Sequence, residues 1–269
     1  MTEEVPPAPE PLAVPALDSH CHLDIIGGDP AEILAASRAV GVARIVTVGV
    51  DVGSSQWCAD TAENYAGIDA TVAIHPNEAP HTPDAAFDEI ARLAALPHVR
   101  AVGETGLDHY RTDEEHWAAQ EESFRRHIAI AKSAGKALVI HDRDAHDDVL
   151  RVLDEEGAPE LTVFHCFSGD ADVARRCADR GYVMSFAGNV TFKNAGDLRA
   201  AAQVPPRELL LVETDAPFLT PTPHRGKPNA PYLIPLTLRA LADVRGDDVD
   251  ALCAAVSATG ERVFGPGES

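Results

Sequence analysis

The sequence predicts an α/β protein of one domain, folded as a (β/α)8 TIM barrel. Its 269 residues match the roughly 250 that such a barrel needs. Short β-branched runs alternate with longer alanine-rich stretches, a pattern typical of parallel strands joined by crossover helices. Ionisable side chains follow six of the eight runs, and only a barrel brings the carboxyl ends of so many strands to one point.

The expected strands are eight apolar, β-branched runs. They cover residues 14–19, 45–50, 68–74, 99–103, 137–140, 161–164, 182–186 and 209–212. The expected helices are amphipathic, and several end in Gly, as helices often do. They include residues 31–40, 117–134, 145–156 and 171–180. A doubly wound open sheet is the alternative, but no GxGxxG turn follows the first run.

The start of the chain differs from the rest. Residues 1–15 are acidic and rich in proline, so we expect a flexible tail before one barrel domain over residues 16–269. This start has neither the basic nor the apolar segment of a secretory signal, and no apolar run approaches the ~20 residues of a membrane helix. The five cysteines include no CxxC pair, which predicts reduced thiols and a cytoplasmic location.

The negative net charge limits how the chain can bind nucleic acid. The chain has 43 acidic and 22 basic residues, a net charge of −21, which opposes binding along a long polyanion. Aromatic residues make up only 5%, too few for an extended base-stacking surface. Contact with nucleic acid must therefore be local.

Two histidines follow the first run. In His20-Cys21-His22, a period of two puts both imidazoles on the same side, a spacing suited to two ligands of one ion. Two hydrogen-bonded histidines at a strand end are the alternative. The ends of the other runs favour the metal site.

Three of those ends carry further candidate ligands. Glu104 is preceded by Gly103, where a loop can turn just past the strand, and its carboxylate can bridge two ions, although a solvated loop acid is the simpler explanation of this residue alone. His141 and His165 each end an apolar run. A histidine that packs in the core is the usual explanation for one such residue. It is a weaker explanation for two histidines at equivalent strand ends.

Two acids follow the eighth run. Alternation places Glu213 and Asp215 on the same side, and Pro217 ends the strand. A helix cap is the alternative for Asp215, but Pro217 argues against a helix directly here. We expect Asp215 to be a ligand that can also act as general base, with Glu213 in support.

Taken together, these motifs resemble the TatD family of metal-dependent deoxyribonucleases, a branch of the amidohydrolase-like barrels. The resemblance spans Asp18 to Phe264 and is carried by residues 18–24 (DSHCHLD), 103–108 (GETGLD), 140–145 (IHDRDA), 165–169 (HCFSG), 213–217 (ETDAP) and 223–229 (PHRGKPN). His109 departs from the pattern, since the family often has an aromatic residue there. The proline-rich start lies outside it.

The resemblance implies two metal ions that share one bridging carboxylate. One ion would be held by His20, His22, Glu104 and Asp215, and the other by Glu104, His141 and His165. The mixture of imidazoles and carboxylates suits zinc or manganese better than magnesium, although availability can override this preference. Two such ions can lower the pKa of a shared water and clamp the oxygens of a phosphodiester displacement.

The candidate substrate contacts lie mainly in loops after the strands. Residues 224–229 concentrate donors in an acidic chain, and Arg225 and Asn229 are predicted to grip a phosphate. The alternative is a solvated proline-rich loop in which Asn229 makes a local turn contact. Arg143 and Ser168 are further candidates, while His75 either contacts substrate or packs.

The leading hypothesis is a deoxyribonuclease that acts on DNA ends or short nucleic acid, with no membrane or obligate protein partner. An amidohydrolase or an ester hydrolase, such as a D-aminoacyl-tRNA deacylase, is the alternative within the same chemistry. A partner-binding protein with a vestigial site is the alternative of another class. The completeness of the ligand set disfavours it.

Overall fold

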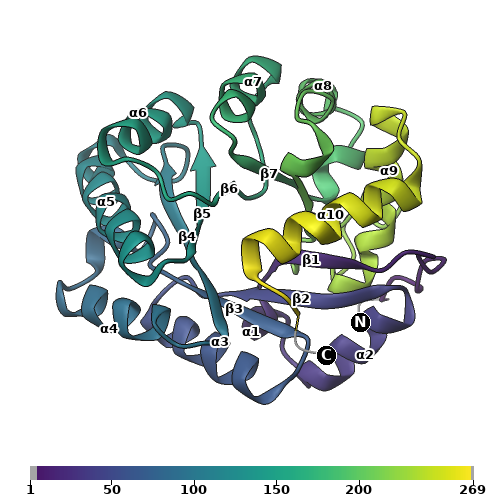
Figure 1. Cartoon of the computed structure of the whole chain (residues 1–269), viewed down its shortest axis with the longest axis horizontal. Coiled ribbons are helices and arrows are strands. Elements are labelled where there is room, and N and C mark those ends of the chain that lie inside the picture. The colour runs from purple at the N-terminus through teal and green to yellow at the C-terminus, as the bar shows by residue number, and fades with distance from the viewer. Residues whose placement is uncertain (1–4, 268–269) are drawn as a thin grey trace.

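The computed structural model describes residues 5–267 and forms one barrel (Figure 1). Eight parallel strands pair in sequence order. They are β1 (Ala16–Cys21), β2 (Val42–Val48), β3 (Ile68–Val72), β4 (Val99–Asp108), β5 (Ala137–Arg143), β6 (Thr162–Phe164), β7 (Val183–Phe186) and β8 (Leu210–Val212).

Main-chain hydrogen bonds join the end of β1 to the segment after β8. The N–H of Asp215 donates to the His20 carbonyl at 2.9 Å, and the N–H of His22 donates to the Ala216 carbonyl at 2.8 Å. Cys21 pairs with Ala216 in an isolated parallel bridge. The ring is thereby nearly closed, so the predicted (β/α)8 barrel is confirmed and the open sheet is wrong.

Helices surround the strands as an outer ring, apart from the last, which lies across one end of the barrel (Figure 1). The helices are α1 (Leu23–Ile26), α2 (Pro30–Ala39), α3 (Val52–Asn64), α4 (Ala85–Ala94), α5 (Trp117–Ala134), α6 (His146–Glu156), α7 (Ala171–Asp179), α8 (Gly196–Ala202), α9 (Ile234–Arg245) and α10 (Val249–Phe264). Local sequence sets their ends: the Asp29 carboxylate caps α2, and Gly135 ends α5 in the left-handed region. Within residues 5–267, no helix is both long and apolar enough to cross a membrane.

The last helix covers the amino end of the barrel. Figure 1 shows α10 lying across the ring. Its Gly260 packs against Leu17 near the start of β1, where an added Cβ would lie 2.7 Å from a Leu17 methyl. Arg44 of β2 donates to the carbonyls of Phe264 and Gly265 at 3.0 and 2.7 Å. With this end covered, the carboxyl end is the one left for a site.

Strand β4 runs on to Asp108, past the predicted end at residue 103. Glu104 therefore lies inside the strand, and the prediction that it follows the strand in a loop is wrong. The reason is glycine: Gly106 has φ +138°, and a Cβ there would collide with the carbonyl of His141. The two glycines of this stretch let β4 stay paired with β5.

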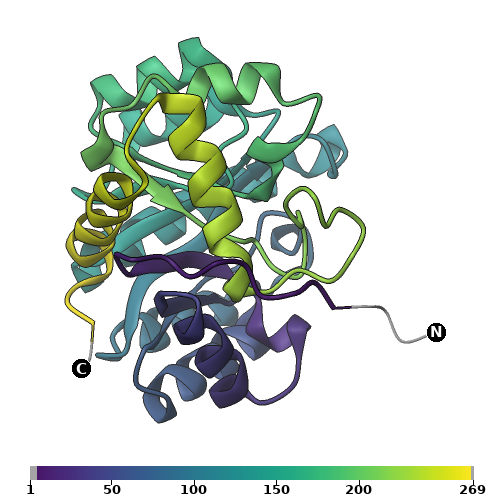
Figure 2. The same cartoon turned by 90° about the vertical axis from the view of Figure 1, so that its right-hand side faces the viewer.

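The proline-rich segment contacts the barrel where it is described. Residues 1–4 lie outside the described residues, whereas Leu12 is buried. The Tyr232 hydroxyl donates to the Pro6 carbonyl at 2.7 Å, and Arg239 of α9 donates to the Pro11 carbonyl at 3.1 Å. Figure 2 shows the segment beside the start of α9. The flexibility of residues 1–15 stays a prediction.

A buried histidine ties α5 to the end of β3. His127 accepts a hydrogen bond from the main-chain N–H of Ile74 through Nε2 at 3.0 Å, and Nδ1 donates to the Ser123 carbonyl at 2.7 Å. Burial lowers the pKa of His127 to about 4. The neutral ring therefore holds the residue that precedes His75.

We expect this histidine to make stability fall as the pH falls from about 6.5 to about 4. The unfolded chain binds a proton at the ordinary pKa, while the folded chain does not until the lower one. Between pH 7 and pH 5 the wild type should lose about 2 kcal/mol more than His127→Gln. Urea unfolding of both proteins at the two pH values measures this, and equal losses would contradict it.

Candidate metal centre

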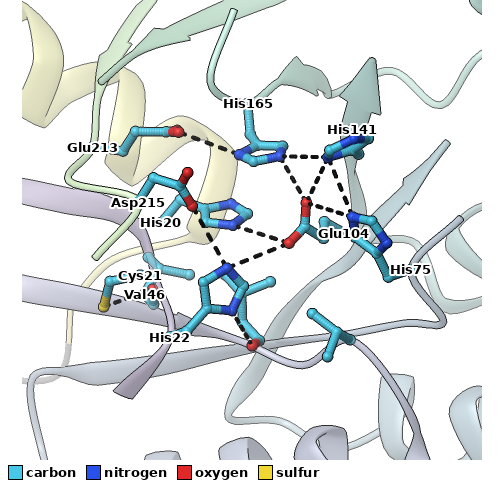
Figure 3. Close-up of polar contacts among 12 residues, drawn as sticks. His20, Cys21, His22, Val46, His75, Glu104, His141, His165, Glu213 and Asp215 are labelled. Atoms are coloured by element: carbon cyan, nitrogen blue, oxygen red, sulfur yellow. Dashed lines mark hydrogen bonds and ion pairs between the residues drawn. The ribbon is translucent and has the colours of Figure 1, made fainter. Parts of the chain in front are cut away.

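Glu104 is the centre of a cluster of imidazoles at the carboxyl end of the barrel (Figure 3). Its side chain is buried, and ring nitrogens of five histidines lie within 4 Å of its carboxylate oxygens. The distances are 3.5 Å for His20, 3.4 Å for His22, 3.7 Å for His75, 3.1 Å for His141 and 2.7 Å for His165. One carboxylate is thus shared by all five rings.

These side chains come from strands that are far apart in the sequence. His20 lies on β1 and His22 directly after it, Glu104 on β4 and His141 on β5. His75, His165 and Asp215 lie just past β3, β6 and β8. They converge because parallel strands in a barrel all point their carboxyl ends to the same opening.

The His20 ring shows that this cluster fits a cation. Both of its nitrogens are buried and have no hydrogen-bond partner among residues 5–267. The ring stacks on that of His165, with centroids 3.9 Å apart. A buried imidazole without a hydrogen-bond partner is costly, and a metal ion would bind its free lone pair. Ligand atoms of His20, His22 and Glu104 all lie within 4.8 Å of one another, as a metal site requires.

Groups outside the cluster orient its rings. The Val48 carbonyl lies 3.2 Å from His22 Nδ1, so that nitrogen carries the proton and Nε2 faces Glu104. A carboxylate oxygen of Asp108 lies 3.2 Å from His141 Nε2, and one of Glu213 lies 3.2 Å from His165 Nδ1. Such outer contacts set the tautomer of a metal-binding histidine. Ligand atoms of Glu213, His20 and His165 also lie within 4.8 Å of one another, so the supporting role of Glu213 stays a prediction.

Asp18 joins two segments that carry candidate ligands, the end of β1 and the segment after β8. Its carboxyl accepts hydrogen bonds from the main-chain N–H of His20 at 3.2 Å and of Thr214 at 2.9 Å, and from the Thr214 hydroxyl at 2.5 Å. Burial raises the pKa of Asp18 to about 8, although the Thr214 contacts act to lower it. The contact joins residues 196 positions apart.

The two acids of the cluster are carboxylates at neutral pH. Burial acts to raise the pKa of Glu104, but the neighbouring imidazoles outweigh it and hold that pKa well below its usual value. Burial is likewise outweighed at Asp215, whose pKa is lowered by His22 and His20. Two buried negative charges amid imidazoles are a donor set for a divalent ion.

His75 lies beside these ligands but presents a proton. Its Nδ1 accepts a hydrogen bond from the main-chain N–H of Asn77 at 3.1 Å. The neutral ring therefore carries its proton on Nε2, the atom that faces Glu104. Burial lowers the pKa of His75 to about 3, so the ring is neutral. A neutral Nε2–H suits an oxygen of the substrate better than it suits a metal ion.

A cavity of about 510 Å³ opens above the cluster. Three of the predicted substrate contacts line it, namely His75, Arg143 and Ser168. Arg225 lines a neighbouring cavity of about 440 Å³ instead. Asn229 is buried, and its amide donates to the carbonyls of Thr214, at 2.9 Å, and Phe218, at 2.5 Å. Asn229 thus makes the local contact that was the alternative to a phosphate contact.

Several residues at the site, Arg111 among them, went unnoticed in the sequence. Asp108 contacts His141, and its place in the Gly-Leu-Asp motif was the available signal. Asn189 lines the cavity with a buried carbonyl oxygen that has no partner among residues 5–267. Phe218 lines the cavity while 51% exposed. No pattern in the sequence distinguished the last two.

Comparisons with known proteins agree with this geometry. The family model described as TatD related DNase matches residues 17–265. A metal-dependent hydrolase TatD of Mycobacterium tuberculosis, described as uncharacterized, is 44% identical over 261 residues, covering 93% of this chain and 98% of that protein. A 3'-5' ssDNA/RNA exonuclease TatD of Citrobacter rodentium is 34% identical, covering 88% and 92%.

Solved structures show the same architecture. The crystal structure of YjjV, a TatD homologue from Escherichia coli, matches with a TM-score of 0.88 and 26% identity, covering 93% of this chain and 98% of that one. A TatD family hydrolase from Entamoeba histolytica matches with a TM-score of 0.80 at 17% identity, covering 93% and 98%. The second likeness is one of fold alone. The family match includes every predicted metal ligand.

Proposed function

This chain belongs to the TatD family of metal-dependent hydrolases, and from that premise we propose that it cleaves phosphodiester bonds at the ends of DNA. The observation that carries the proposal is the buried His20 beside the shared carboxylate of Glu104, with no hydrogen-bond partner for either ring nitrogen among residues 5–267. The cavity above them is lined by Arg111 and Arg143, which suit a phosphate. A relative that is described as an exonuclease supports the choice of nucleic acid.

We propose that the site takes two divalent ions, zinc, manganese or magnesium. Each set of ligands includes Glu104: the first adds His20, His22 and Asp215, and the second adds His141 and His165. When bound, such ions neutralise phosphate charge and lower the pKa of a water. Glu213 and Asp108 would then keep the His165 and His141 rings in one orientation.

Side chains of the protein can accept the proton of the attacking water and donate hydrogen bonds to the phosphate. Hydrolysis forms one bond from a water oxygen to phosphorus and breaks the bond from phosphorus to the leaving oxygen. Asp215 lines the cavity as a carboxylate and can accept the proton of that water. His75 can donate a hydrogen bond through Nε2, and Arg143 can pair with a phosphate oxygen.

A substrate panel tests this proposal. Single-stranded DNA, RNA and acyl esters would be offered to one preparation, first after chelation and then with each metal added back. We expect cleavage of DNA that requires added metal. Hydrolysis of acyl esters without any cleavage of DNA would overturn the proposal and favour the carbonyl hydrolase.

Removal of either histidine of the second set should remove one ion. We expect His141→Ala and His165→Ala to bind one ion per chain where the wild type binds two, because Glu104 and the first set remain. Both variants should fold, since these residues lie at the strand ends and not among the layers that fill the barrel. Metal analysis with thermal unfolding decides it, and two bound ions or an unfolded chain would count against the assignment.

A cytoplasmic location and purely local contact with nucleic acid remain proposals as well. All five cysteines are free, and four of them are buried. The net charge of −21 would repel a long strand except near the basic residues of the site.

A further inference from the structure

Three arginines differ from all the others in the chain. Within residues 5–267, the guanidinium groups of Arg111, Arg143 and Arg225 make no hydrogen bond or ion pair, whereas those of the other arginines do. All three line the metal cavity or its neighbour. In a chain with 43 acidic residues, three cations at one end of the barrel that have no anionic partner among the described residues point to an anionic ligand.

Two of these arginines lie on aromatic rings. The guanidinium carbon of Arg143 is 4.0 Å from the ring centroid of Tyr110, and that of Arg225 is 3.8 Å from the ring centroid of Phe192. Tyr110 is 65% exposed, which makes it one of four large hydrophobic side chains that are exposed in the described part of the chain. A stacked guanidinium keeps its N–H edge free for a phosphate and its outer plane free for a base.

The two pairs lie on different sides of the metal cavity. Tyr110 follows β4 and Arg143 is the last residue of β5, whereas Phe192 and Arg225 lie in the loops after β7 and β8. In a ring of eight strands in sequence order, β4 lies opposite β8, and β5 and β7 lie two strands apart. Leu219 lines both cavities, so the cavity of Arg225 adjoins the metal cavity.

Both pairs are held in place before any ligand binds. Asp108 accepts hydrogen bonds from the main-chain N–H groups of Tyr110 and Arg111 at 3.0 and 2.8 Å. The loop that carries Arg225 is tied to that of Phe192 by Thr222, whose N–H donates to the Thr191 hydroxyl at 2.8 Å. Groups ordered in advance lose less entropy on binding.

We propose that the Tyr110–Arg143 and Phe192–Arg225 pairs are two nucleotide subsites that hold an unpaired DNA strand across the metal cavity. This inference rests on the proposed function. Each arginine binds a phosphate, and one base stacks on each pair. A base paired in a duplex already stacks on its neighbours, so the two subsites select single-stranded ends.

The test compares two substrates in one preparation of metal-loaded enzyme. One is a single-stranded DNA tetranucleotide, and the other is bis(p-nitrophenyl) phosphate, a diester without a base. The kcat/KM for the tetranucleotide, divided by that for the small diester, should fall on the order of tenfold in Tyr110→Ala and in Phe192→Ala. Tyr110→Phe and Phe192→Tyr keep a ring for stacking and should keep the ratio.

Each other outcome would overturn the subsites. An unchanged ratio in the alanine variants, or an equal loss on both substrates, would mean that the rings do not bind bases. If the enzyme cleaved a blunt duplex as fast as the single strand, the subsites would not select single-stranded ends. These results leave DNA cleavage by the wild type intact, whereas a wild type that hydrolyses the small diester but no DNA would refute the proposed function itself.

Discussion

Glu104→Gln should remove bound metal and lower phosphodiester turnover on the order of 10³-fold or more, since losing even an outer partner of a metal ligand costs ~10–100-fold. Within residues 5–267, Glu104 is the one side chain with oxygens within 4 Å of all five imidazoles. The amide has nearly the same shape, but it carries no charge, and one of its two ends is a donor. It therefore cannot bridge two cations.

Metal content per chain and turnover of a small diester would be measured side by side. Glu213→Gln is the matched control, because it is the same change in a buried acid whose ion pair with the cluster, among residues 5–267, is with His165. The control should keep two ions and lose less activity. Two ions retained in Glu104→Gln would show that this carboxylate is not the bridge.

Asp215→Asn should lower turnover at least ~10²-fold, the lower range for loss of general acid–base catalysis. The carboxylate lines the cavity and lies 3.6 Å from His22 Nε2. Its amide counterpart cannot accept the proton of the attacking water. Substrate binding should change less, because the cations of the cavity remain.

The backbone makes asparagine the right replacement at this position. Asp215 has φ +52°, a left-handed conformation that Asn tolerates and that strains Ala. The asparagine variant should thus keep the fold, so kcat and KM report on chemistry. Thermal unfolding checks the fold, and near-normal kcat would exclude Asp215 from the mechanism.

The sequence by itself determined the barrel and its candidate ligands. Each strand can be recognised from the local sequence as an apolar run. Each candidate ligand is the polar residue at or just past the end of that run, as at His20, His141 and His165. Parallel strands then place these ends at one opening without any knowledge of distances. Glu104 was found in the same way, although the strand that carries it extends further than predicted.

Only the tertiary structure decided how these residues are paired. The Asp18 clamp on Thr214 joins positions 196 apart, and the contact of Glu213 with His165 joins positions 48 apart. Asn229 was predicted to touch substrate, but its amide is buried against two carbonyls. Local patterns cannot show such contacts, because a side chain's partners, tautomer and exposure depend on groups that folding alone brings within hydrogen-bond distance.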